Sequence, residues 1–166
     1  MAIVASEIKF FLSGGGGNTD PNLSLGGAIS STEAPQTING LFKAASPAES
    51  TSGSIKYRAI WFKNTDISLT LTDAVAYISQ ETTGVDDTTA IAYDSGGTQT
   101  VPNENTAPSS PTLSFSTPLS QGAGIALSDT SAGTARLLWI RWTVTAGATV
   151  PVAIVGKLRV VGGTPP

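Results

Sequence analysis

The sequence contains no cysteine and no histidine, and it has few charged residues of either sign. Without cysteine no disulfide can crosslink the fold, so packing or assembly with other chains must stabilise it. Without histidine the chain lacks the side chain that most often performs acid–base catalysis near neutral pH. The same two absences exclude Ser-His-Asp triads, cysteine nucleophiles and zinc sites built from cysteine or histidine. The sequence therefore predicts a protein that is not an enzyme.

Charged residues make up 13% of the 166 residues, against roughly 25% in ordinary soluble domains. The net charge is −3, and the nine lysines and arginines are scattered along the chain. A surface that follows nucleic-acid phosphates needs clustered basic residues, so we expect no nucleic-acid partner. No segment approaches the ~18 to 20 apolar residues that span a bilayer, so we expect no membrane partner. Glu7 and Lys9 interrupt the first apolar segment, and we expect no signal peptide.

Hydroxyl residues take the place of the missing charge, with 19 serines and 22 threonines. Abundant threonine, valine and isoleucine suit the half-buried faces of strands, whereas a helical chain would contain more Glu, Lys, Arg and Leu. Alternating segments recur at spacings of roughly ten residues with turn residues between them, which is typical of a β-sandwich or barrel. We therefore predict an all-β fold, an antiparallel β-sandwich. Immunoglobulin-like and jelly-roll arrangements both fit the strand pattern.

The first 54 residues are less regular than the rest. Residues 2–13 alternate in polarity, which predicts one strand. Gly14 to Gly17 and the polar residues after them predict a break in regular structure. One turn of helix is expected within residues 38–45, and the small, polar residues 46–54 show no regular pattern. We expect an extended, loosely organised N-terminal arm.

The main body is predicted to begin at Ile55. Asn64-Thr65-Asp66 separates two alternating segments, which predicts a hairpin in which residues 67–72 return along residues 55–62. No repeat and no second block of different composition is present, so we expect one domain. Its parts are an arm with edge strands (1–54), a main sandwich (55–161) and a tail (162–166).

The alternating segment Ala135–Val144 is apolar on both faces. Such a strand either lies centrally between two layers or meets another subunit with one face. Core packing is expected for Trp61 and Trp139, which lie in the middle of strands, but we favour a subunit contact for part of this strand. The candidate subunit contacts are Phe10, Leu12, Trp139, Arg141 and Trp142.

Two polar segments are candidate ligand sites. Asp86 and Asp87 are adjacent carboxylates, but neighbouring residues point in different directions and the threonine-rich loop at residues 82–89 favours a solvated position. Gly14 to Gly17 lack the lysine of a phosphate-binding loop and the helix of a dinucleotide site. A flexible or closely packed turn is expected there, with calcium at Asn18 and Asp20 as the alternative. We predict no catalytic, cofactor-binding or metal-binding residues.

Several segments carry a resemblance to known proteins. They are Glu7–Gly14, Asn18–Asn22, Tyr57–Thr65 with Leu69–Ala74, and Leu127–Gly133 before Trp139–Val144. The two later pairs resemble the strand–turn–strand segments of immunoglobulin-like sandwiches. Taken together, the chain is similar to small virion proteins of tailed bacteriophages, which include structural, decoration and tail proteins.

This resemblance implies a function without catalytic residues. It implies a capsid decoration (cement) protein, commonly a trimer, that binds the major capsid protein and bridges its subunits. Such a protein is assembled in the host cytoplasm and lies on the capsid surface of the virion, and its N-terminal arm would add to a neighbour's sheet edge. A tail, collar or fibre component is the alternative structural role. A carbohydrate-binding module with exposed aromatic residues is a further alternative.

Overall fold

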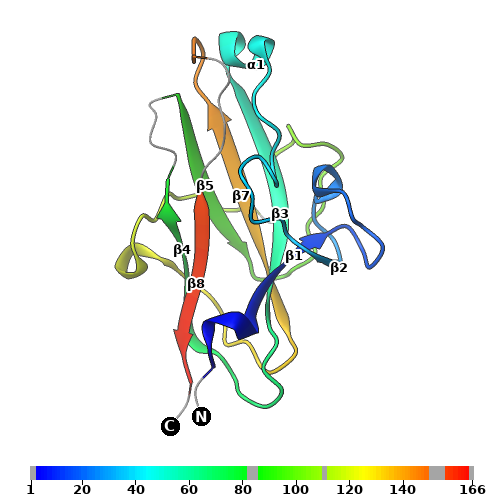
Figure 1. The fold of residues 1–166 in the computed structure, drawn as a ribbon, viewed down its shortest axis with the longest axis vertical. Coiled ribbons are helices and arrows are strands. Elements are labelled where there is room, and N and C mark those ends of the chain that lie inside the picture. The colour runs from blue at the N-terminus through cyan, green and yellow to red at the C-terminus, as the bar shows by residue number, and fades with distance from the viewer. Residues whose placement is uncertain (1–2, 82–85, 110–111, 150–155, 165–166) are drawn as a thin grey trace.

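The computed structural model describes residues 3–81, 86–109, 112–149 and 156–164. They form two packed antiparallel sheets, with strand order β2-β1-β3-β7-β5 in one and β6-β4-β8 in the other (Figure 1). The strands are β1 (Ile8–Ser13), β2 (Ile29–Glu33), β3 (Ser54–Asn64), β4 (Thr72–Gln80), β5 (Asp87–Asp94), β6 (Ile125–Ala126), β7 (Ala135–Val144) and β8 (Lys157–Gly163). The helices are α1 (Pro47–Ser52) and the 3₁₀ turns η1 (Ala5–Glu7), η2 (Pro21–Leu23) and η3 (Gln121–Ala123). The predicted all-β sandwich is confirmed.

The two longest strands form the centre of the larger sheet. β3 and β7 pair without interruption from Ser54 opposite Val144 to Lys63 opposite Ala135. Their inner faces, which include Ile60 and Trp142, pack against the smaller sheet. Their outer faces pack under irregular segments of the chain that carry Leu25 and Phe115. The strand predicted over Ala135–Val144 is therefore present with the same bounds.

β7 lies centrally between layers, and this corrects the favoured subunit contact. The side chains of Leu12, Trp139 and Trp142 are 0% exposed within this single chain. Trp142 belongs to the core between the sheets, and Trp139 belongs to the core under the outer segments. Because the chain itself covers Leu12 on β1 and both tryptophans on β7, these three residues have no surface to offer to another subunit.

The N-terminal segment is an integral part of the sheet, and the expectation of a loosely organised arm is wrong. β1 lies between β2 and β3 in the larger sheet. The buried Ser24 hydroxyl donates to Ala59 O at 2.6 Å and accepts a hydrogen bond from Ser13 N at 2.9 Å. A small hydroxyl side chain thus satisfies buried backbone groups at the end of β1 and in the middle of β3. This role has no periodicity that the sequence alone would reveal.

The predicted hairpin after β3 is also wrong, although its turn chemistry is present. The Asn64 side chain donates to Leu69 O at 2.8 Å and to Thr130 O at 2.9 Å. The Asp66 carboxylate accepts from the backbone of Ser68 and Leu69. These bonds fix a corner that carries the chain from the larger sheet to the smaller one, so residues 67–71 form no strand and β4 belongs to the other layer.

The helical turn expected within residues 38–45 is absent, and a short helix forms at Pro47–Ser52 instead. Ser46 Oγ accepts from Glu49 N at 3.3 Å, and the Glu49 carboxylate accepts from Ser46 N at 2.8 Å. This reciprocal cap, with proline at the first helical position, is a recognised helix start. The sequence Ser46-Pro47-Ala48-Glu49 contains this helix-start signal, although the composition of residues 46–54 indicates only a small, polar segment.

Candidate functional site

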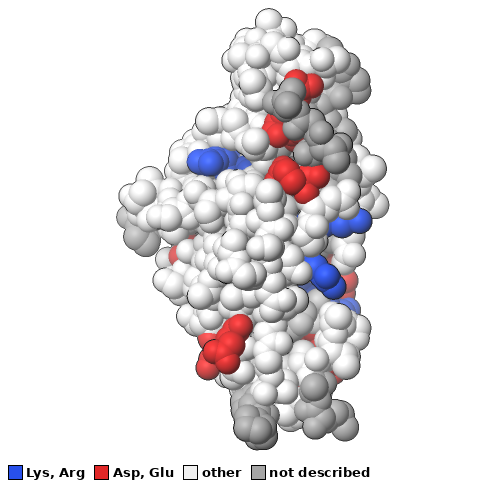
Figure 2. Space-filling view, turned by 90° about the vertical axis from the view of Figure 1, so that its left-hand side faces the viewer, with Lys and Arg blue, Asp and Glu red and all other residues white. Residues whose placement is uncertain are grey.

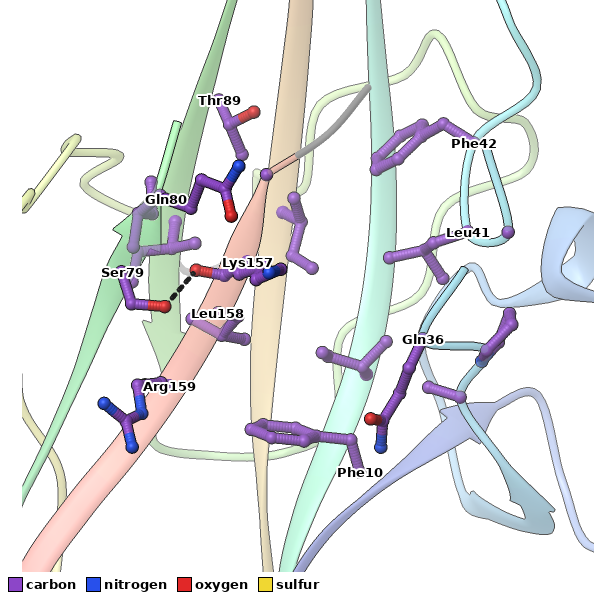
Figure 3. Close-up of a pocket in the computed structure, with 18 of the residues that line it drawn as sticks. Phe10, Gln36, Leu41, Phe42, Ser79, Gln80, Thr89, Lys157, Leu158 and Arg159 are labelled. Carbon is purple, nitrogen blue, oxygen red and sulfur yellow. Dashed lines mark hydrogen bonds between the residues drawn. The ribbon is translucent and has the colours of Figure 1, made fainter. Parts of the chain in front are cut away.

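A groove of about 650 Å³ opens on the inner face of the larger sheet, where the smaller sheet ends at β8 (Figure 3). Its floor is formed by isoleucines of three strands of the larger sheet: Ile60, Ile91 and Ile140. β8 and the end of β4 form one wall, and residues 34–42 form the other. Phe10 lies at the lower end and Phe42 at the upper end. We call this feature the β8 groove.

The first wall is an edge strand. β8 is the last strand of its sheet and is paired with β4 alone among the described strands. Leu158 and Val160 pack toward the core, whereas Lys157 and Arg159 are exposed. A strand at this position presents unpaired backbone N–H and C=O groups along its free side. The β8 groove therefore combines an apolar floor with a free strand edge.

The opposite wall is held in place by its own hydrogen bonds. Ala34 N donates to Phe10 O at 2.8 Å, and Gly40 N donates to Thr37 O at 2.9 Å across a tight turn. A Cβ atom on Gly40 would lie 2.7 Å from Thr37 Oγ1, so the turn is closely packed. At its tip Ile38 is 64% exposed. This wall is thus held in one conformation by its own contacts, and it exposes the apolar side chain of Ile38 to solvent beside the groove.

The ionisable side chains among the described residues of the groove are Lys157 and Arg159, and both are basic. General acid–base catalysis requires a proton donor and acceptor with matched pKa values, and this lining supplies no carboxylate. At the upper end the Thr89 hydroxyl is buried and has no hydrogen-bond partner among the described residues. The groove therefore offers apolar side chains, a hydroxyl group and two basic side chains for contacts.

The two adjacent carboxylates, Asp86 and Asp87, have different hydrogen-bond partners. Asp87 is 2% exposed, begins β5 and accepts a hydrogen bond from the indole Nε1 of Trp142 at 2.6 Å. The prediction of a solvated loop is therefore wrong for Asp87, while residues 82–85 of that loop lie outside the described residues. The Asp86 carboxylate accepts from Thr149 N at 3.4 Å. Asp87 acts as a structural partner of the core tryptophan.

The polar residues after the glycine run bind the chain itself. Asn18 Nδ2 donates to Ser13 O at 2.6 Å. The Asp20 carboxylate accepts from the backbone and side-chain nitrogens of Asn22, and these hydrogen bonds hold the pKa of Asp20 below its usual value. Within the described ranges no three Asp, Glu, Cys or His residues cluster as metal ligands. These residues hold the turn together, which is closely packed at Gly14 and open at Gly15, Gly16 and Gly17.

A buried ion cluster at the upper end of β3 was not predicted from the sequence. Lys56 and Arg58 face the interior, and Lys56 Nζ lies 2.6 Å from Glu49 Oε1 and 3.4 Å from Glu104 Oε1. Arg58 pairs with Glu104 as well. Burial raises the pKa of Glu49, but hydrogen bonds from Lys56 and Ser46 outweigh it and leave this pKa below its ordinary value. The cluster fastens α1 and the Glu104 segment to β3, so its charges are neutralised within the chain.

Two of the five candidate subunit contacts keep accessible surface. Phe10 is half-buried and lines the β8 groove. Arg141 is half-buried on the outer face of the larger sheet, where its guanidinium lies 5.2 Å from the ring centre of Phe115. Because they belong to opposite faces of one sheet, the fold does not bring them together into one contact surface.

The side of the molecule that Figure 2 shows is mostly uncharged, with acidic and basic side chains at scattered positions. In the described part of the chain no helix has the length and apolar character needed to cross a membrane. A scan against protein-family models finds no match, and neither the curated proteins nor the solved structures contain a significant match to this chain.

Proposed function

We propose that this chain is a non-enzymatic module that binds other proteins, and that its specific role is capsid decoration in a tailed bacteriophage. The observation that carries the proposal is the β8 groove, where an apolar floor lies beside a free strand edge and the described lining has no acid–base pair. Free strand edges and apolar grooves are surfaces by which proteins bind extended segments of other proteins.

The virion role is supported by the segments that resemble small phage structural proteins and by the composition. The low content of charged residues suits a surface that other subunits cover, because charged residues are depleted at the cores of interfaces. In this role the chain binds the major capsid protein, as a trimer on the capsid surface, and buries apolar and backbone groups across the seams between subunits. Those contacts oppose the outward pressure of packaged DNA.

A tail, collar or fibre position is the alternative structural role, and location in the particle separates the two. Sugar binding has less support, because stacking on a sugar requires an exposed aromatic face. Trp139 and Trp142 are buried, and the indole nitrogen of the half-buried Trp61 donates to Gly27 O at 3.0 Å. We therefore do not propose a carbohydrate-binding function.

Electron cryo-microscopy of purified virions that encode this chain tests the role. The expected result is density for the sandwich at repeated positions on DNA-filled heads, in contact with the major capsid protein. A matched preparation of heads isolated before tail attachment is the control that separates head from tail. Absence of the chain from purified particles, or its confinement to the tail, would overturn the decoration role.

A further inference from the structure

The charges around the β8 groove are unbalanced. Lys157 and Arg159 lie side by side along β8, exposed, in a chain with an overall charge of −3. Their neighbours on β4 are uncharged, since Arg159 lies opposite Tyr77 and Lys157 lies opposite Gln80. No ion pair joins either residue to an acidic residue of the described chain. The free edge of β8 is therefore basic on its exposed face.

The two faces of β8 determine which side chains an added strand needs on each of its own faces. Leu158 and Val160 point toward the core, and Lys157 and Arg159 alternate with them on the outside. A strand added to the free edge would place alternate side chains beside each set, because side chains on adjacent strands lie opposite one another. Inward positions meet the isoleucine floor and Phe10, and outward positions meet two cations.

From this geometry we infer that the β8 groove binds an extended segment of a partner protein, in which apolar residues alternate with acidic ones, as an added strand on β8. The inference deepens the proposed function and rests on it. Seven residues of β8 span about 23 Å at the usual strand rise, so the segment that fits is about five to seven residues long. Ile38 on the opposite wall offers a further apolar contact to such a segment.

A second copy of this chain fits the groove less well. Pairing between two β8 edges would place both Lys157–Arg159 pairs on one face of a joined sheet, and like charges on adjacent strands destabilise the pairing. Lysine on an edge strand is also a common device against such self-association. The charges thus favour an acidic partner segment over a second β8.

Fluorescence anisotropy with labelled nine-residue peptides tests the inference on the purified full chain. The probes are an alternating Val–Glu peptide, an alternating Val–Lys peptide and a Val–Glu peptide with one central proline, which removes a backbone donor. We expect the Val–Glu peptide to bind roughly tenfold more tightly than the Val–Lys peptide, as two exposed charge pairs allow. The proline peptide should also bind more weakly. Equal binding of the acidic and basic peptides, or binding of neither, would overturn the inference.

Charge reversal provides the matched variants. In Lys157→Glu/Arg159→Glu the preference should reverse toward the Val–Lys peptide, a result that an unfolded variant does not give. Lys43→Glu changes an exposed charge outside the groove lining and should leave the preference unchanged. Retention of the Val–Glu preference by the double variant would contradict the inference.

Hydrogen exchange identifies the bound edge. Addition of the Val–Glu peptide should slow exchange of the amides within residues 157–163, and unchanged exchange there would contradict strand addition. If a higher protein concentration without peptide protects the same amides, a second copy occupies the groove, and the inference is also overturned.

The two proposals can fail separately. If virions contain the chain but the chain binds no peptide, only the inference is overturned. Peptide binding with no chain in virions would overturn the decoration role alone.

Discussion

The two faces of the larger sheet are covered in different ways. The outer face is covered by irregular segments that fit closely against it, whereas the inner face is covered by a second sheet that ends at β8. On the outer side the segments join each other, with Gly27 N donating to Gln99 O and Val101 N donating to Leu25 O, both at 3.0 Å. On the inner side the smaller sheet leaves the β8 groove uncovered.

The difference shows what limits each kind of cover. Irregular segments can follow the shape of a sheet because side chains and turns satisfy their backbone groups one at a time. A sheet extends only by whole strands, so its last strand leaves a step and a free edge. The outer face is thus closely covered, whereas the inner face keeps an open groove. Substitutions on both faces of the larger sheet test this division.

The largest effect is expected on the outer side from Gly26→Ala. Gly26 has a φ of +95°, and a Cβ atom there would lie 2.0 Å from Gln99 O. The clash would separate the two covering segments, so we expect a loss of about 3–5 kcal/mol in the free energy of unfolding, or no folding at all. Denaturant unfolding measures it. Gly16→Ala is the control, because nothing lies within 4 Å of its Cβ position; similar midpoints for both variants would refute the close fit.

A smaller effect should separate the two buried tryptophans on opposite faces of β7. Trp142 donates to the buried Asp87 carboxylate, whereas the Trp139 indole nitrogen has no partner within the part of the chain that the structure describes. Substitution by phenylalanine removes similar volume at both sites, but only Trp142→Phe removes a hydrogen bond to a carboxylate. We expect Trp142→Phe to cost about 1.5–3 kcal/mol more than Trp139→Phe in chemical unfolding. Equal costs would contradict the structural role assigned to Asp87.

A third effect depends on pH and concerns the ion cluster at the upper end of β3. Because the pKa of Glu49 is lower in the folded chain than its ordinary value of 4.5, its contribution is present above that pH and is lost as the pH falls through the folded pKa. Glu49→Gln should cost up to about 1 kcal/mol at neutral pH and should reduce the loss of stability below about pH 4.5. Thermal unfolding between about pH 3 and about pH 7, a range that spans both forms of the carboxyl group, measures this.

The control for Glu49 is Glu33→Gln, which removes the carboxylate of the exposed pair with Lys9. Exposed pairs contribute little, so this variant should follow the wild-type pH profile closely. An unchanged profile for Glu49→Gln would show that the cluster does not couple folding to pH.

The smallest effect on stability is expected from Ile38→Ser in the wall of the β8 groove. Because Ile38 is 64% exposed, its substitution should change the free energy of unfolding by less than about 0.5 kcal/mol. The same variant should weaken binding of the Val–Glu peptide. A loss of stability typical of a core residue would show that Ile38 is packed in solution and that the groove is closed.

The secondary structure of the central strands could be predicted from local pattern, because alternation over β3 and β7 follows directly from a pleated strand. The partners of those strands could not. Asn64 and Asp66 were identified as turn formers, but the same hydrogen bonds serve a hairpin and a corner between sheets. Which one forms depends on where the next strand finds an apolar face to cover.

The candidate site was predicted only in part. Phe10 was selected from its place in an apolar strand face and does line the groove. Lys157, Arg159 and Ile38 were not selected, because their importance comes from the free edge beside them and not from any spacing in the sequence. Trp139 and Trp142 were selected as contacts, but the segments that bury them are distant in the chain.

The sequence by itself determined the all-β class, since its side chains suit strands and its alternating segments have the period of a pleat. Its lack of cysteine and histidine also removed whole classes of chemistry, because the side chains that perform them are missing from the chain. Only the tertiary structure decided which strand became an edge, which faces were covered and where the β8 groove opened. Those features depend on pairing between distant segments, which is set by packing of the whole chain and leaves no local signature.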